Sequence, residues 1–321
     1  MKSLFCASAS ACACLVICSP NVMAQSTVTI NGLVDIGVYR ASNVWNVGSI
    51  QRSNIAFKGS EDLGDGLAAI FRLSTRFSPD TGTTESAPDK PFWHGESTVG
   101  LRGSFGTVRF GRALEAINDA NGDFDPWGYF DQIASAPWDM WQYNWPSDPK
   151  ANSGKPDYGR LNNGIFYDSP EWGPVQIHIS GSPEKRDGDK RRSLSGAMNY
   201  NQGPLQAMVG IGRNSNDDKD TFLGLRGNFG SFSLMGAYDH SVSGDSTAKV
   251  VTVGAEYRLN AFTFKANYGQ LDLDGVKFEK LAGAGASYQL SKRTRVYADF
   301  GHREFVSSSN NSYGVGLAHR F

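Results

Sequence analysis

The sequence predicts an all-β fold, namely a 16-stranded antiparallel transmembrane β-barrel. Three observations support this fold class. After residue 24 the chain divides into segments of about 8 to 12 residues in which polar and apolar side chains alternate, separated by Gly, Asn, Asp, Ser or Pro. No later run approaches the roughly 18 apolar residues that a membrane helix requires. The connections are also unequal in length, as in barrels that have short turns at one end and long loops at the other.

Sixteen alternating segments account for the strands of this barrel. In the first, Val28, Ile30 and Val34 share one side, while Thr29 and Asp35 share the other. The segments cover residues 28–39, 50–58, 67–77, 97–103, 108–112, 162–168, 175–180, 194–200, 205–212, 222–228, 232–239, 250–259, 262–269, 281–290, 295–301 and 313–321.

The polar faces of these segments decide between two folds that share a one-sided alternation. A soluble sandwich would point its apolar face inward, whereas a membrane barrel points it toward lipid. The polar faces here are rich in glycine and carry about one charge per strand, as in Gly224, Arg226 and Asn228. Such faces suit a crowded, wet lumen, and sixteen strands enclose a lumen wide enough to hold water.

The amino-terminal 24 residues resemble a secretory signal, with Lys2 followed by an apolar run and with Val22-Met23-Ala24 before the expected cleavage site. An uncleaved anchor and a lipoprotein signal at residues 15–18 remain alternatives. All four cysteines lie in this segment, at Cys6, Cys12, Cys14 and Cys18. The expected mature chain, residues 25–321, therefore has neither a disulfide framework nor a thiolate metal site.

Other function classes find little support in the sequence. The formal net charge of −1 argues against a nucleic-acid partner. Five histidines, at positions 94, 178, 240, 302 and 319, lack the paired spacing of a zinc hydrolase, so we expect no metal and no cofactor. The segment GDSTA (244–248) loosely resembles a nucleophile elbow but lies in a predicted loop, which makes an enzyme, such as a barrel hydrolase, the least favoured alternative.

One connection, residues 115–160, is much longer than the others. It holds Trp127, Trp138, Trp141 and Trp145, which are four of the seven tryptophans. A disordered linker of this length would be poor in aromatic residues. We therefore expect this loop to pack, and inside a barrel the available surface is the lumen wall.

Three segments resemble the trimeric general porins of Gram-negative bacteria, especially the beta-proteobacterial branch. They are FKGSEDLGDGLAAIFRLSTRF (57–77), GLRGSFGTVRFGR (100–112) and NNGIFYDSP (162–170), and the likeness extends over the whole mature chain to Phe321. The resemblance implies an outer-membrane homotrimer of 16-stranded barrels whose third loop folds inward and narrows the pore. It also implies that the barrel-assembly machinery reads the terminal Phe321. Periplasmic chaperones and lipopolysaccharide are further expected partners.

Strand alternation defines the candidate pore constriction. Arginines with the polar parity of their segments are expected to face the lumen: Arg52, Arg72, Arg76, Arg102, Arg109 and Arg160. The long loop offers acids against them: Glu115, Asp119, Asp123, Asp125, Asp131, Asp139 and Asp148. Opposed basic and acidic walls create a transverse field that favours polar solutes. The alternative is that these charges pair and only pin the loop to the wall.

The function predicted from these features is passive diffusion of small hydrophilic solutes and ions across the outer membrane. A substrate-preferring channel is the main alternative, in which sugars or aromatic acids stack on the four loop tryptophans. The terminal stretch YGVGLAHRF (313–321) has an outward apolar stripe and is expected to close the barrel against the first strand.

Overall fold

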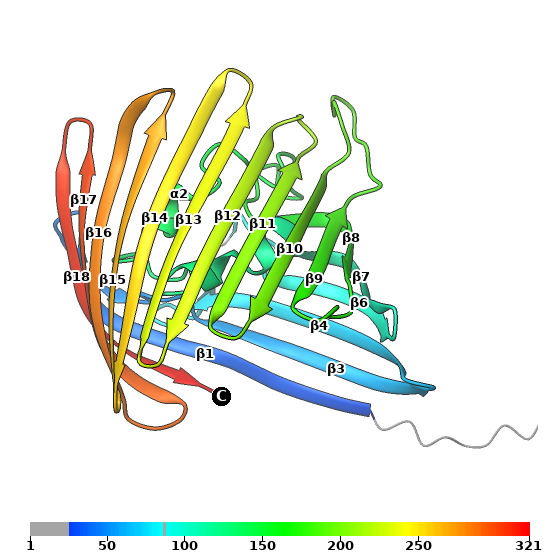
Figure 1. The fold of residues 1–321 in the computed structure, drawn as a ribbon, viewed down its shortest axis with the longest axis horizontal. Coiled ribbons are helices and arrows are strands. Elements are labelled where there is room, and N and C mark those ends of the chain that lie inside the picture. Colours follow the sequence, from blue (N-terminus) through cyan, green and yellow to red (C-terminus); the bar gives the residue numbers. More distant parts are fainter. Residues whose placement is uncertain (1–25, 86–87) are drawn as a thin grey trace, which may run out of the picture.

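A computed structural model describes residues 26–85 and 88–321, so the predicted signal segment 1–24 lies outside the described residues. Sixteen antiparallel strands form a closed barrel (Figure 1), which confirms the predicted fold class and strand number. The barrel strands are β1 (Ser26–Ala41), β3 (Asn54–Gly64), β4 (Leu67–Ser78), β6 (Glu96–Gly103), β7 (Gly106–Leu114), β8 (Arg160–Asp168), β9 (Val175–Gly181), β10 (Leu194–Gln202), β11 (Leu205–Arg213), β12 (Lys219–Phe229), β13 (Phe232–Ser243), β14 (Ser246–Leu259), β15 (Phe262–Leu273), β16 (Val276–Gln289), β17 (Thr294–Phe305) and β18 (Ser309–Arg320).

Every barrel strand pairs with its sequence neighbours, and the first strand closes the ring. Residues 26–33 of β1 pair with β3, while residues 33–40 pair with β18. Two short strands, β2 (Val44–Gly48) and β5 (Thr83–Thr84), lie in connections and add to β1 and β4. The helices are short: α1 (Ala116–Asp119), the 3₁₀ turn η1 (Asn121–Phe124) and α2 (Pro137–Met140). Among the described residues, no helix has the length and apolar character needed to cross a membrane.

The strands expose apolar side chains outward and bury polar ones inward, as the alternation predicts. On β1, Val28 and Ile30 are more than half exposed, whereas Asp35 is fully buried. On β18, Val315 and Leu317 are exposed and Ala318 is buried. An apolar outer face that is exposed in water would be unfavourable, so this arrangement fits a lipid environment.

The predicted second strand, 50–58, begins too early. The observed strand β3 starts at Asn54, because inward-facing Asp35 pulls the preceding segment out of the wall. The carboxylate Oδ1 of Asp35 accepts hydrogen bonds from the backbone N–H groups of Ile50 (2.9 Å) and Gln51 (2.7 Å). Tyr297 donates its hydroxyl to the other oxygen at 2.5 Å. The intervening residue, Arg52, therefore reaches the lumen from an irregular segment rather than from strand alternation.

Candidate permeation pathway

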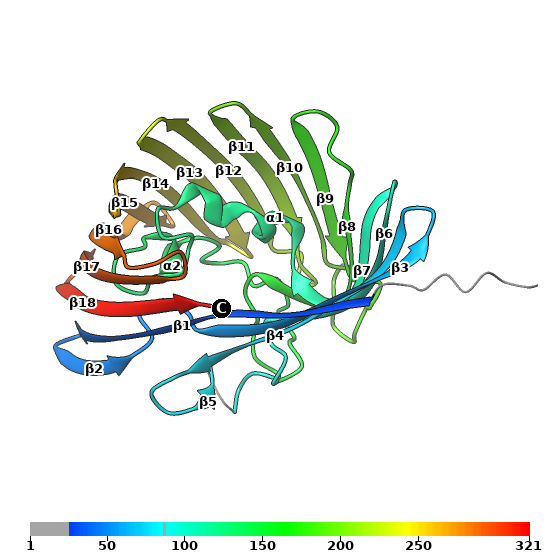
Figure 2. The same cartoon turned by 90° about the horizontal axis from the view of Figure 1, so that it is seen from below.

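Residues 115–159, called the inward loop from here on, lie inside the ring of strands (Figure 2). The loop follows a row of inward-facing glycines on the wall, and a Cβ added at any of them would lie within 3.0 Å of a loop atom. The glycine row consists of Gly210, Gly212, Gly224, Gly254, Gly269, Gly283, Gly301 and, where the loop partner is the Trp127 ring at 3.0 Å, Gly285. Missing side chains on the wall thus make room for the loop backbone and its aromatic residues.

The aromatic residues of the inward loop form a core against the wall. Trp145 is completely buried and donates its indole N–H to the carbonyl of Asp218 at 3.2 Å. Trp141 is only 3% exposed and packs between Tyr129 and Phe222, at ring-centroid distances of 5.7 and 4.9 Å. These contacts explain why a loop of this length can be ordered.

Two aspartates organise the loop backbone from inside. Asp125 Oδ2 accepts hydrogen bonds from the N–H groups of Trp127 and Tyr129, both at 3.0 Å, and burial raises the pKa of this carboxyl. Asp131 Oδ1 accepts from the N–H groups of Ile133 (2.9 Å) and Ala134 (2.8 Å). Burial also raises the pKa of Asp131 well above its usual range. Both side chains serve the fold of the loop.

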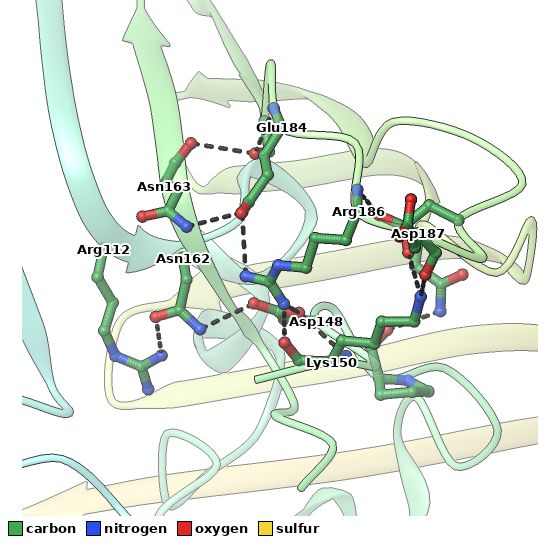
Figure 3. A network of polar contacts seen from close by, with 12 residues as sticks. Arg112, Asp148, Lys150, Asn162, Asn163, Glu184, Arg186 and Asp187 are labelled. Carbon is green, nitrogen blue, oxygen red and sulfur yellow. Dashed lines mark hydrogen bonds and ion pairs between the residues drawn. The ribbon is translucent and has the colours of Figure 1, made fainter. Parts of the chain in front are cut away.

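A polar network fixes the far end of the inward loop to the barrel (Figure 3). Asn162 on β8 accepts a hydrogen bond from Arg112 at 2.8 Å and donates one to Asp148 of the loop at 2.8 Å. Arg186, in the connection 182–193, pairs with Asp148 at 3.6 Å and with Glu184 at 3.0 Å. The loop is thus fastened to two neighbouring parts of the wall.

A cavity of about 1010 Å³ remains between the inward loop and the opposite wall. Its lining is mainly polar and contains ten basic side chains but five acidic ones, among the residues that the structure describes. The basic residues are Arg52, Arg72, Arg76, Arg109, Arg160, Arg226, Arg258, Lys265, Arg295 and Arg320, and the acidic ones are Glu96, Asp119, Asp123, Asp125 and Glu256. A water-filled space with such a lining is a path for hydrophilic solutes.

Five of the six arginines predicted at the constriction line this cavity, and Arg102 does not. Arg52 and Arg76 face aromatic rings of the loop, with the Arg52 guanidinium 4.6 Å from the Trp138 ring centroid and that of Arg76 5.4 Å from Phe130. Arg102 is exposed next to the tight turn after β6, and its nearest partner is the Ser60 hydroxyl at 3.5 Å. Its position in the alternation of β6 is an inward one, but it lies one residue pair from the turn to β7 and so near the end of the barrel.

Six of the seven predicted acids divide into three groups, and the seventh, Asp148, is buried in the polar network at the far end of the loop. Asp119, Asp123 and Asp125 line the cavity. Glu115 and Asp131 are fully buried, so the expectation that they form an exposed acidic wall is wrong for both. Asp139 is exposed and pairs with Arg303 at 2.6 Å, and it does not line the cavity. Alternation could not separate these groups, because the loop does not follow strand periodicity.

The tryptophans are also placed differently from one another. Trp127 lines the cavity but is nearly buried, with the Lys265 ammonium 5.6 Å from its ring centroid. One face of the half-buried Trp138 is covered by Arg52. Trp141 and Trp145 are buried in the loop core, which leaves them no face for a passing solute.

The second half of the barrel supplies basic side chains that the predicted constriction omits. Arg226, Arg258, Lys265, Arg295 and Arg320 all line the cavity. Their signal in the sequence is the same inward parity as that of the first six arginines. The predicted constriction contains only charges of the first half of the chain, although the same alternation continues through the second half.

Comparison with known proteins agrees with this architecture. The family model for Gram-negative porins matches residues 8–308. Outer membrane porin protein 32 of Delftia acidovorans is 28% identical over 86% of this chain and 84% of its own length. Major outer membrane protein P.IB of Neisseria meningitidis serogroup B is 27% identical over 94% of this chain and 96% of its own length. A solved anion-selective porin from Comamonas acidovorans superimposes with a TM-score of 0.79 at 23% identity, over 92% of this chain and all of that one.

The barrel, its charged lumen and these matches define a channel protein. The chain belongs to the Gram-negative porin family. It is an outer-membrane barrel that forms a water-filled channel for passive diffusion, which confirms the predicted function and location. Family membership implies a channel rather than an enzyme.

Proposed function

We propose that this porin prefers anions. The observation that carries the proposal is the excess of ten basic over five acidic side chains in the cavity lining. A lining with a net positive charge raises the local concentration of anions and lowers that of cations, most strongly where low-dielectric walls focus the field. The structural similarity to an anion-selective porin supports the same direction.

Ion pairing in the cavity leaves part of this basic excess without a carboxylate partner. Glu96 forms ion pairs with Arg72 at 3.2 Å and with Arg109 at 3.0 Å. Glu256 forms ion pairs with two other arginines. Buried Asp125 is held by hydrogen bonds from the loop. By contrast, five basic residues have no carboxylate within 4.0 Å among the described residues: Arg76, Arg160, Lys265, Arg295 and Arg320. The positive charge of these side chains is therefore not cancelled by a direct ion pair and contributes to the field across the cavity.

Reversal potentials across a planar bilayer with a KCl gradient test the proposal. We expect the wild type to favour chloride, and the double variant Arg76→Gln/Arg160→Gln to lose about threefold in the chloride-to-potassium permeability ratio, equivalent to ~0.7 kcal/mol per ion. Arg102→Gln is the matched control, because this arginine is inward-facing but remote from the cavity. A wild type that favours potassium would overturn the proposal. An equal fall of the permeability ratio in Arg102→Gln and in the double variant would also overturn it.

The same proposal includes the assembly and the partners of the channel. We infer that the protein acts as a homotrimer without a catalytic step, which the family relationship supports. A groove on the outer face of β1, β16, β17 and β18, lined by Val38, Ala286, Ala298, Val315 and Leu317, offers small and apolar side chains for contact in the membrane. Lipopolysaccharide, periplasmic chaperones and the assembly machinery remain expected partners. Mass measurement of the detergent-solubilised protein under native conditions tests the trimer.

A further inference from the structure

Three side chains from different elements meet where the inward loop crosses the wall. Asp119 is on α1, Asp168 ends β8, and His178 lies on β9, and one ligand atom from each lies within 4.8 Å of the others. His178 Nδ1 is 2.8 Å from Asp168 Oδ1 and 4.0 Å from Asp119 Oδ2. We propose that these three residues bind a divalent transition-metal ion, with Zn²⁺ as the best fit, and that the ion joins the loop to the wall.

The ligand set has the composition that Zn²⁺ uses with three protein ligands and a water. One imidazole nitrogen and two carboxylate oxygens bind at about 2.0–2.2 Å, which separates ligand atoms by about 3.3 Å around a tetrahedral ion. Asp168 and His178 are already close enough. Only Asp119 has to approach, by at most about 1.5 Å in this geometry, and its side chain is exposed on a loop helix.

The surroundings of His178 favour metal binding through its Nδ1 atom. Its Nδ1 donates to Asp168, so its Nε2 accepts the hydrogen bond from Asn199 Nδ2 at 3.2 Å. Asn199 is buried, and its own carbonyl oxygen has no partner among the described residues. When the metal binds Nδ1, the proton moves to Nε2 and the imidazole stays neutral. Rotation of the Asn199 amide by half a turn then presents the unpartnered oxygen to that proton, which is the outer hydrogen bond that metal-bound histidines require.

Arg109 leaves the metal-facing oxygen of Asp168 free. Its guanidinium pairs with Asp168 Oδ2 at 3.1 Å, whereas His178 approaches Oδ1. Arg109 also pairs with Glu96 at 3.0 Å, so its charge is shared between two carboxylates. The arginine can therefore orient Asp168 in the manner of an outer partner while the metal takes the other oxygen.

The position of Asp119 determines how an ion reaches the site and how its binding changes permeation. This residue lines the cavity, so an ion in the pore reaches the site directly. Binding neutralises one of the few acids of the lining and adds positive charge to an already basic lumen. We therefore expect Zn²⁺ to shift permeation further toward anions and to hold α1 against β8 and β9.

Isothermal titration of the detergent-solubilised full chain with ZnCl₂ tests the site without reference to ion selectivity. We expect one ion per protomer, and a loss of at least about tenfold in affinity in both His178→Asn and Asp119→Ala, since each removes one of three ligands. The matched control is His302→Asn, because His302 Nε2 lies 3.4 Å from Glu304 but has no third ligand within the part of the chain that the structure describes. Its affinity for Zn²⁺ should equal that of the wild type.

Unchanged affinity in Asp119→Ala would overturn the proposal. Equal losses in His302→Asn and His178→Asn would also overturn it, since they would indicate scattered surface binding. Should His178→Asn fail to fold, the exposed Asp119 variant decides alone. Failure of Zn²⁺ binding leaves anion preference in KCl intact, so the two proposals can fail separately.

Discussion

Glu115 is a residue whose surroundings strongly disfavour ionisation. Its side chain is completely buried at the start of the inward loop, where the Ser195 hydroxyl offers at most a weak hydrogen bond to the carboxyl group. Burial, followed by the charge of Asp148, raises the pKa of Glu115 well above its usual range. The folded state therefore holds this proton more tightly than the unfolded chain, and ionising Glu115 opposes folding.

This environment predicts a pH-dependent stability. Because the folded pKa is raised, the stability is complete below the ordinary glutamate pKa and falls as pH rises toward the folded value. Glu115→Gln removes the titration, so its advantage over the wild type should grow from about pH 5 upward, by roughly 1.4 kcal/mol per pH unit at most. Urea unfolding of the purified barrel, monitored by gel mobility at several values between pH 5 and pH 8, measures the difference in the free energy of unfolding. Exposed Glu171→Gln is the control, and a pH-independent difference for Glu115→Gln would contradict the assignment.

At the scale of single residues, the sequence predicts the face of a strand but not the height of a side chain along it. Arg72 and Arg102 share inward parity, yet only Arg72 reaches the cavity. The cluster of Asp119, Asp168 and His178 could not be predicted, because its members come from a loop and two strands whose register is known only from the pairing. Arg52 lines the cavity from an irregular segment, where hydrogen bonds to Asp35 rather than strand alternation fix the backbone.

At the scale of elements, the inward loop and the glycine row form one unit. Gly301 illustrates the fit, since a Cβ there would overlap the carbonyl oxygen of Ile133, next to the turn that Asp131 organises. The length and aromatic content of the loop were enough to predict that it packs. The wall surface that receives it was not predicted, because glycine at an inward position has many explanations in a sequence.

The fit at Gly301 predicts a selective effect on the loop. We expect Gly301→Ala to leave the barrel intact but to displace the loop, because a backbone carbonyl cannot move aside as a flexible side chain can. The variant should show a larger or noisier single-channel conductance. Gly236→Ala is the control, because its added Cβ would lie 3.4 Å from the nearest atom, an ordinary contact. Identical traces for both variants and the wild type would show that the loop is not held by this contact.

At the scale of the whole molecule, closure depends on β1 and β18. The two strands pair over eight residues, from Leu33 with Arg320 to Arg40 with Tyr313. Phe321 extends the seam, because its N–H donates to the Gly32 carbonyl and the Gly32 N–H donates to its carbonyl, both at 3.2 Å. The alternation of the last segment predicted this closure, since a strand with one apolar face has to find a neighbour on both edges.

The Phe321 ring and its backbone have separable roles. Phe321→Ala keeps both backbone hydrogen bonds and loses ring contacts, including those beside Gly32, so refolding of the purified chain into detergent micelles should remain close to wild type. If the ring is read by the assembly machinery, the same variant should accumulate several-fold less folded protein in the outer membrane of cells. Phe321→Tyr, which keeps an aromatic ring, should assemble normally. Equal yields in cells for Phe321→Ala and wild type would assign the ring no role as a signal, whereas a matching loss during refolding in micelles would assign its effect to the seam, because no machinery is present there.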